Sequence, residues 1–170
     1  CKDADQTVVY GVNHKNISKT DHIISVASCT TNCLAPLTFA IHKNFKIENG
    51  YMTTVHSYTS DQRLLDNSHK DLRRARSAPN AIVPTSTGAA KSLKMIIPEL
   101  ASKIDGVSIR VPTPNVSLVQ LSFNSQKKLT KEKINSSLLK ASKTYLKNVS
   151  GVEQKPLVSS DFNHDPRSSI

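Results

Sequence analysis

The first candidate for chemistry is Cys29, which stands where a predicted strand gives way to a predicted helix, between Ser28 and Thr30. At the start of an α-helix, free N–H groups and the helix dipole favour the thiolate over the thiol and supply donors for a developing oxyanion. A small buried cysteine is the ordinary alternative at such a position. The flanking hydroxyl residues favour the reactive thiol, so we predict that Cys29 is a nucleophile.

His56 is the candidate partner of this thiol because it closes the predicted strand TTVHSYTSDQ, at the mouth of the predicted sheet. An imidazole within hydrogen-bonding distance could take the thiol proton during attack and remove protons later. The spacing alone fits a core histidine bonded to backbone equally well. Cys33, one helical turn after Cys29, is predicted to be structural. Two thiols within one turn, with no C-x-x-C or H-x-x-x-H nearby, make a poor zinc site, so no metal is expected.

Four arginines are the candidate phosphate ligands. Arg73, Arg74 and Arg76 lie in the basic stretch HKDLRRAR, and Arg110 ends a predicted strand in RVPTPNVS. Planar guanidinium groups suit phosphate oxygens, and two separated arginine sites could hold two phosphates. Thr87 and Gly88 open a predicted helix in PTSTGAAK, where the free N–H groups form an anion cradle or a simple N-cap equally well.

The elements that must position these residues interleave along the chain. Hydrophobic periodicity predicts helices at residues 30–45, at residues 89–97 and from residue 130, and strands at residues 8–12, 22–28, 51–58, 106–111, 117–125 and 156–159. Residues 48–50 predict a turn, and residues 58–80 an extended basic loop whose length is typical of a binding loop. The order of elements lacks strict βαβ alternation. It predicts an α+β fold, a mixed and largely antiparallel sheet with helices packed on one face.

Composition narrows the class of protein. The 170 residues are 37% hydrophobic, as expected of one globular domain. No run approaches the roughly 18 apolar residues of a membrane span, and the first residues lack a secretory signal, so we expect a cytoplasmic protein without a membrane segment. The net charge of +10 favours anionic ligands, but the 5% aromatic content and the lack of a recognition motif argue against nucleic acid. The five glycines are too scattered for a G-x-G-x-x-G dinucleotide turn.

Taken together, five motifs resemble phosphorylating glyceraldehyde-3-phosphate dehydrogenases in their order and spacing: ASCTTNCLAP, TTVHSYTSDQ, HKDLRRAR, PTSTGAAK and RVPTPNVS. The resemblance covers practically the whole chain. It implies that residues 1–27 end a dinucleotide-binding domain, and that residues 28–170 form a catalytic domain truncated before its C-terminal segment. The start at Cys1 rather than Met also suggests a piece of a longer protein.

The resemblance implies a reaction and a role for each site residue. Cys29 would attack D-glyceraldehyde 3-phosphate to give a thiohemiacetal, and His56 would assist as hydride leaves for NAD. Inorganic phosphate would then cleave the thioester to give 1,3-bisphosphoglycerate, a step of glycolysis. Thr59 and Arg110 would hold the substrate phosphate. The residues implied around the attacking phosphate are Ser28, Thr30, Arg74, Thr87 and Gly88.

The family further implies NAD bound mainly by the missing N-terminal domain, a homotetramer in which the basic loop meets a neighbouring subunit, and a fragment that is inactive by itself. Erythrose-4-phosphate dehydrogenase is a related alternative, which Thr59 and Gly88 argue against. A Cys–His thiol acyltransferase or hydrolase, and a basic nucleic-acid-binding module, are alternatives from other classes.

Overall fold

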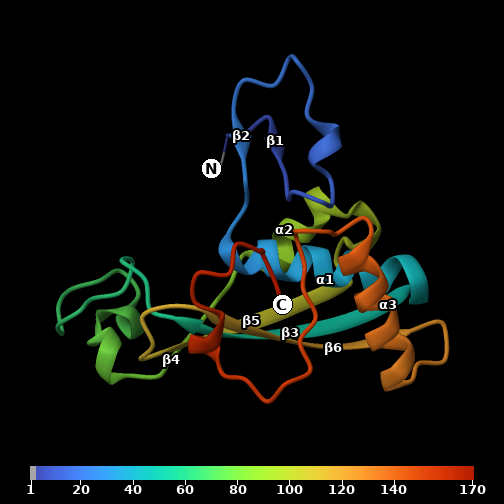
Figure 1. Ribbon diagram of the computed structural model, residues 1–170. Helices are drawn as coiled ribbons and strands as arrows, with labels where there is room; N and C mark the ends of the chain where they lie inside the picture. Colours follow the sequence, from blue (N-terminus) through green and yellow to red (C-terminus); the bar gives the residue numbers. More distant parts are fainter. Residues whose placement is uncertain (1–2) are drawn as a thin grey trace.

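A mixed β-sheet forms the centre of the structure, a computed structural model that describes residues 3–170 (Figure 1). Cys1 and Lys2, with which the first predicted domain segment begins, lie outside the described residues. The sheet order is β4-β5-β3-β6, with β4 at Val83–Thr85, β5 at Ile104–Val111, β3 at Ile47–Ser57 and β6 at Ser117–Ser125. β3 and β5 are parallel, whereas the two outer pairings are antiparallel. The predicted mixed, largely antiparallel sheet is confirmed.

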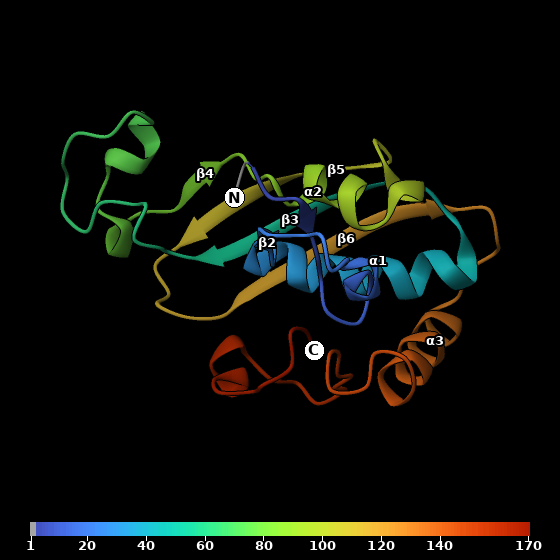
Figure 2. The ribbon, with the colours of Figure 1, turned by 90° about the horizontal axis from the view of Figure 1, so that it is seen from above.

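The helices gather on one side of this sheet. They are α1 at Cys29–Phe45, α2 at Ala89–Ile96 and α3 at Lys131–Lys143, close to the predicted bounds. α1 and α2 lie over the same face of the sheet, and α3 packs against α1 at its flank (Figures 1 and 2). The prediction of helices packed on one face is therefore confirmed. Within residues 3–170, no helix has both the length and the apolar character needed to cross a membrane.

Strand alternation sets which side chains of β3 face the helices. Successive residues of a strand point to opposite faces of the sheet, so Met52, Thr54 and His56, at alternate positions, share one face. All three are buried. Met52 shares one apolar core with Leu34 of α1 and Leu93 of α2, each fully buried. Burying one such side chain contributes about 1.5–3 kcal/mol. This core fixes α1 over β3, and the C-terminal end of the buried row, His56, meets the start of α1.

The turn predicted at residues 48–50 is wrong, because β3 runs straight through it. Gly50 pairs with Ile104 on one side and with Phe123 on the other. A Cβ at Gly50 would lie 2.9 Å from the carbonyl oxygen of Ser122. The glycine therefore serves the close approach of β6 rather than a change of direction.

The strand predicted at residues 8–12 is also wrong. A two-residue strand β1, Gln6–Thr7, pairs in parallel with β2, Ile24–Ser25, which occupies only part of the predicted 22–28 strand. The chain then turns, because the Asn13 side chain accepts from the Val9 N–H at 2.8 Å and donates to the Thr7 carbonyl at 3.0 Å. Two of the apolar residues that suggested a strand, Val8 and Val9, are instead buried beside a turn, at 5% and 1% exposure.

Two further differences concern short elements. β4 was not predicted, since it has three residues with Pro84 in the middle, and residues 156–159 lead into a short 3-10 helix, Ser159–Phe162, instead of forming a strand. The basic loop contains two 3-10 helices, Leu72–Ala75 and Ala78–Asn80, and otherwise follows an irregular path. β4 follows this loop in the sequence and pairs with β5 at the edge of the sheet, so the end of the loop lies there.

Candidate active site

The start of α1 is defined by a side-chain cap. Ser28 has extended backbone angles, and its Oγ accepts from the Thr31 N–H at 3.1 Å and also bonds the Thr31 hydroxyl at 2.7 Å. Serine is among the residues preferred at this capping position because its oxygen satisfies one of the free N–H groups of the first turn. Cys29 is thereby held as the first helical residue, where the helix dipole favours a negative charge.

The structure brings the predicted thiol and imidazole together. Cys29 Sγ and His56 Nε2 lie 3.2 Å apart, from α1 and the end of β3 respectively. On its other side, His56 Nδ1 lies 2.7 Å from the carbonyl oxygen of Ser57 and 2.9 Å from Nη1 of Arg110. Nδ1 cannot donate to the first and accept from the second at once. The tautomer that donates to Ser57 leaves Nε2 as an acceptor for the thiol proton, while Arg110 Nη1 also donates to the Ser57 carbonyl at 2.9 Å.

The two cysteines of α1 have different pKa values, because only Cys29 contacts His56. The hydrogen bond with His56, aided by its charge and by bonds with Thr30, lowers the pKa of the Cys29 thiol to about 7, against the opposing effect of partial burial. Burial and the neighbouring Cys29 raise the pKa of Cys33 to about 11. At neutral pH Cys29 is thus close to half ionised, and Cys33 remains a thiol. The expected structural role of Cys33 agrees with this difference.

Arg110 links the pair to Thr59. It ends β5 directly opposite His56 in the parallel register, and its Nη1 lies 3.4 Å from Thr59 Oγ1. Burial and the nearby Arg74 lower the pKa of Arg110 from its ordinary value, although a guanidinium stays charged at neutral pH. The arrangement presents a cation and a hydroxyl together, as a phosphate group requires.

Arg74 reaches the same region from the basic loop. Its Nη2 and Nε donate to Thr85 Oγ1 on β4 at 2.8 and 3.2 Å, which ties the loop to the sheet. Its Nη1 pairs with Asp61, and its Nε lies 3.5 Å from a carboxylate oxygen of Asp71. The hydrogen bond with Arg74 lowers the pKa of Asp61. Arg74 is thus oriented by a hydroxyl and balanced by two carboxylates.

One cavity of about 280 Å³ collects these groups. Every predicted site residue lines it except Thr59, which is connected through Arg110. The predicted residues in its wall are Ser28, Cys29, Thr30, His56, Arg74, Thr87, Gly88 and Arg110. Gly88 precedes α2, and a Cβ there would have no atom within 4 Å, so the backbone at the start of that helix is open to the cavity. The cavity therefore combines a thiol, an imidazole, two guanidinium groups and two helix starts.

Sequence reasoning missed four residues of the wall: Ser86, Ala89, Ser92 and Ser108. Periodicity contained a signal for two of them. Ser92 follows Gly88 by one helical turn, and Ser108 precedes Arg110 by two positions on the same face of β5. Ser86 and Ala89 simply flank the predicted Thr87 and Gly88.

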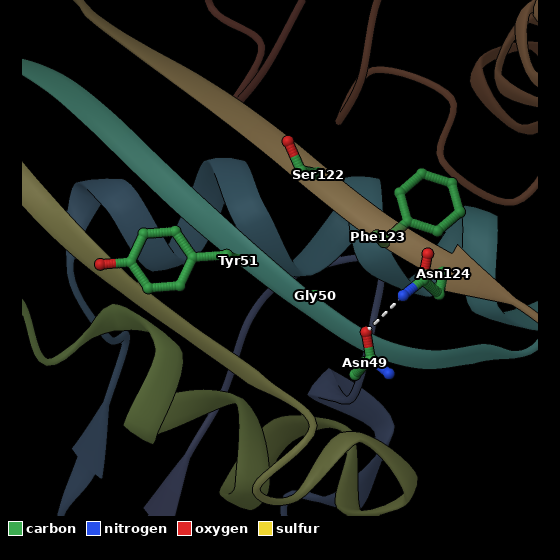
Figure 3. Close-up of a pocket in the computed structure, with 6 residues that line it drawn as sticks. All are labelled: Asn49, Gly50, Tyr51, Ser122, Phe123 and Asn124. Carbon is green, nitrogen blue, oxygen red and sulfur yellow. Dashed lines mark hydrogen bonds between the residues drawn. The ribbon is translucent and has the colours of Figure 1, made fainter.

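A larger hollow of about 370 Å³ lies elsewhere, towards the beginning of β3 (Figure 3). Its wall holds Asn49, Gly50, Tyr51, Ser122, Phe123 and Asn124, and the Asn124 amide donates to Asn49 Oδ1 at 2.9 Å. These residues offer no thiol, imidazole, carboxylate or guanidinium. In residues 3–170 there is likewise no group of three or more His, Cys, Asp or Glu side chains arranged to hold a metal ion. The chemistry of the described chain is therefore concentrated around Cys29.

Comparison with known proteins agrees with the five sequence motifs. The family described as "Glyceraldehyde 3-phosphate dehydrogenase, C-terminal domain" matches residues 28–170. The glyceraldehyde-3-phosphate dehydrogenase of Cereibacter sphaeroides is 53% identical over 170 residues, which are 100% of this chain and 51% of that protein. Those of Zymomonas mobilis and Geobacillus stearothermophilus are 55% and 52% identical over 168 and 169 residues, covering 98% and 99% of this chain and 50% of each relative. The chain thus spans about half the length of these curated relatives. The predicted resemblance is confirmed, and the chain belongs to the glyceraldehyde 3-phosphate dehydrogenase family, of which it carries the C-terminal domain.

Proposed function

We propose that this chain supplies the catalytic half of an NAD-dependent, phosphorylating glyceraldehyde-3-phosphate dehydrogenase of cytoplasmic glycolysis. The observation that carries the proposal is the 3.2 Å approach of Cys29 Sγ to His56 Nε2 inside a cavity that Arg74 and Arg110 also line. A thiol of lowered pKa beside a base is the arrangement needed for covalent catalysis. Two guanidinium groups match a reaction in which both the aldehyde and its co-substrate carry phosphate.

In the first step of the proposed reaction, the Cys29 thiolate attacks the aldehyde carbon and the carbonyl π electrons move to oxygen. The N–H groups at the start of α1 stabilise the negative charge that develops there. The imidazolium of His56 gives its proton to that oxygen, which completes a thiohemiacetal. His56 Nε2, neutral again, is then the base that removes the hydroxyl proton.

Bound NAD would supply the hydride acceptor for the oxidation of the same carbon. The carbonyl re-forms as the proton passes to His56, and Cys29 is left as a thioester. Inorganic phosphate then attacks the thioester carbonyl and the Cys29 thiolate departs, since a thiolate with a pKa of about 7 is a good leaving group. The products are 1,3-bisphosphoglycerate and the free thiolate, ready for another cycle.

The two phosphate groups are assigned to two different sets of residues at the cavity. Arg110 with Thr59 holds the phosphate of the aldehyde, supported by their 3.4 Å contact. The attacking inorganic phosphate is assigned to the two helix starts and Arg74. These ligands are Ser28, Thr30, Arg74, Thr87 and Gly88, all of which line the cavity. Backbone N–H groups at helix starts and guanidinium groups are both favourable phosphate ligands.

The cofactor does not fit the described residues on their own. Ahead of α1 the described residues contain only the two-residue strands β1 and β2 and a short 3-10 helix, His14–Asn16, and the chain has no glycine-rich dinucleotide turn. We therefore assign NAD mainly to the half of its relatives' length that this chain does not span. Residues 1–27 are assigned to the end of that dinucleotide-binding domain, and residues 28–170 to the catalytic domain. The isolated chain should then lack dehydrogenase activity, and the basic loop would meet a neighbouring subunit in a homotetramer.

Alkylation of the chain as a function of pH tests the activated thiol without NAD. Because the pKa of Cys29 is lowered to about 7, the rate of its reaction with iodoacetamide should rise with pH and reach half its maximum near pH 7. Peptide mass spectrometry follows each cysteine separately, and Cys33 is the internal control, with a pKa raised to about 11. A midpoint near the ordinary value of 9.0 would remove the basis of the proposal. Thioester hydrolysis by the chain without NAD would instead support the acyltransferase or hydrolase alternative.

Substitution of Thr85 tests whether Arg74 binds phosphate in the orientation described. Thr85→Val removes the hydroxyl that accepts both Arg74 bonds, so the concentration of inorganic phosphate that half-protects Cys29 from iodoacetamide should rise about 3- to 10-fold, the effect of one or two hydrogen bonds. Thr85→Ser keeps the acceptor and should behave like the unsubstituted chain. Equal protection in the two variants would contradict a role for this orientation.

A further inference from the structure

Ser108 is a buried serine whose hydroxyl has no partner among the described residues, and it lines the cavity that holds Cys29. It lies on β5 at 2% exposure, two positions before Arg110 on the same face of the strand. Its register partners are Thr54 on β3 and Thr85 on β4. A row of three hydroxyl residues thus crosses the sheet beneath the helix starts.

The three hydroxyls of this row differ in their hydrogen bonding. Thr85 Oγ1 accepts from Arg74. Thr54 Oγ1 and Ser108 Oγ are both buried without a partner, but only Ser108 belongs to the cavity wall. An unpaired buried hydroxyl costs about 1–3 kcal/mol, a cost that alanine at the same position would avoid. The unpaired hydroxyl of Ser108 therefore points to a ligand that enters the cavity.

The charges around Ser108 define the chemistry of that ligand. The same wall contains Arg74 and Arg110, and the starts of α1 and α2, all of which favour an anion rich in acceptor oxygens. A serine hydroxyl donates one hydrogen bond without adding charge, and it turns about a single side-chain torsion among three staggered positions. It can therefore meet an oxygen of a phosphate group from the floor of the cavity.

We propose that Ser108 is a phosphate-binding residue of this site, whose hydroxyl donates to a phosphate oxygen in the cavity beside Cys29. The proposal rests on the proposed function, because it adds a ligand to the same anion site. It differs from that function in assigning a role to the sheet floor as well as to the helix starts and arginines. The bond forms only with ligand, so Ser108 contributes to phosphate affinity and not to the stability of the free chain.

The test compares two isolated hydroxyl removals in the same row. Phosphate protection of Cys29 from iodoacetamide is measured for the unsubstituted chain, Ser108→Ala and Thr54→Val. Ser108→Ala should raise the half-protecting concentration of inorganic phosphate about 10-fold, the effect of losing one hydrogen bond to a charged group. Thr54→Val removes an equally buried, equally unpaired hydroxyl outside the cavity wall and should leave protection unchanged. Ser108→Thr, which keeps a donor, should restore most of the affinity.

Two further measurements complete the design. The thermal midpoint of Ser108→Ala without phosphate should equal or exceed that of the unsubstituted chain, so a lower midpoint or a failure to fold would show a structural role and overturn the proposal. Glycerol 3-phosphate in place of inorganic phosphate distinguishes the source of the phosphate group. A loss of protection confined to inorganic phosphate assigns Ser108 to the co-substrate, and a loss confined to glycerol 3-phosphate assigns it to the aldehyde.

The outcomes separate this inference from the proposed function. If phosphate protects the unsubstituted chain and Ser108→Ala equally well, Ser108 is not a ligand and the proposed function stands. If Ser108→Ala and Thr54→Val weaken protection to the same extent, the effect comes from the sheet and the inference also fails. If Cys29 of the unsubstituted chain reacts with a midpoint near 9.0, the proposed function fails first.

Discussion

Cys29→Ala should lower the rate of aldehyde oxidation at least about 10⁴-fold, because it removes the sulfur to which the proposed mechanism attaches the substrate. The measurement is the production of NADH from glyceraldehyde 3-phosphate, NAD and inorganic phosphate, in a full-length enzyme that contains this chain. The fall should appear in kcat rather than in KM, since Arg110 and Thr59, to which we assign the substrate phosphate, are unchanged.

Cys33→Ala is the matched control for this substitution. It removes a sulfur from the same helix, one turn away, whose pKa of about 11 leaves it protonated at neutral pH. Its activity should stay within about 3-fold of the unsubstituted enzyme, as expected for a residue outside the chemistry. Appreciable turnover by Cys29→Ala, or an equal loss in the two variants, would refute the assignment of Cys29 as nucleophile.

His56→Asn should have two effects with one cause. Without the hydrogen bond that lowers it, the pKa of Cys29 should return from about 7 towards its ordinary 9.0, so the midpoint of alkylation moves to higher pH. A thiol whose pKa is 9.0 is only about 1% ionised at pH 7, so the alkylation rate there should fall by roughly 50-fold. Turnover should fall about 10²- to 10⁴-fold, because the base for the hydroxyl proton is lost as well.

His22→Asn provides the control, because it removes an exposed imidazole that does not line the cavity. It should change neither the alkylation midpoint nor turnover. The alkylation midpoint and the turnover of His56→Asn together distinguish two roles of His56, ionising the thiol and accepting the hydroxyl proton. Turnover that recovers fully at high pH, where Cys29 ionises without help, would show that His56 acts only on the thiol and not as the base during hydride transfer.

The helices were predictable from the sequence because their signals are local. Ser28 caps α1 and Thr130 caps α3 through their own side chains, and both helices have apolar residues at helical spacing. The wrong predictions concern segments whose structure depends on residues far away in the sequence. Gly50 resembles a turn residue until β6 is seen to approach its Cα, and β4 has only three residues, whose strand character comes from pairing with β5.

The site divides in the same way. The position of Cys29 at the start of a helix follows from neighbouring residues, whereas its contact with His56 depends on how the core of Leu34, Met52 and Leu93 sets α1 over β3. The spacing of Cys29 and His56 along the chain therefore does not predict that their side chains meet. Ser108 was missed for a similar reason, since a serine in a strand shows its missing partner only when the packing around it is known.

The pairing of Arg74 with Asp61 has a consequence for how quickly a ligand departs. Asp61 already neutralises Arg74, so a phosphate that binds there replaces one anion with another. The binding free energy is then less favourable than at a guanidinium without a carboxylate partner. The Asp61 side chain is 52% exposed and can turn into water while the exchange lasts, then return when the ligand leaves. In the proposed reaction, the Asp61 carboxylate would therefore compete with phosphate at Arg74, so that a phosphorylated product would bind less tightly and leave more quickly.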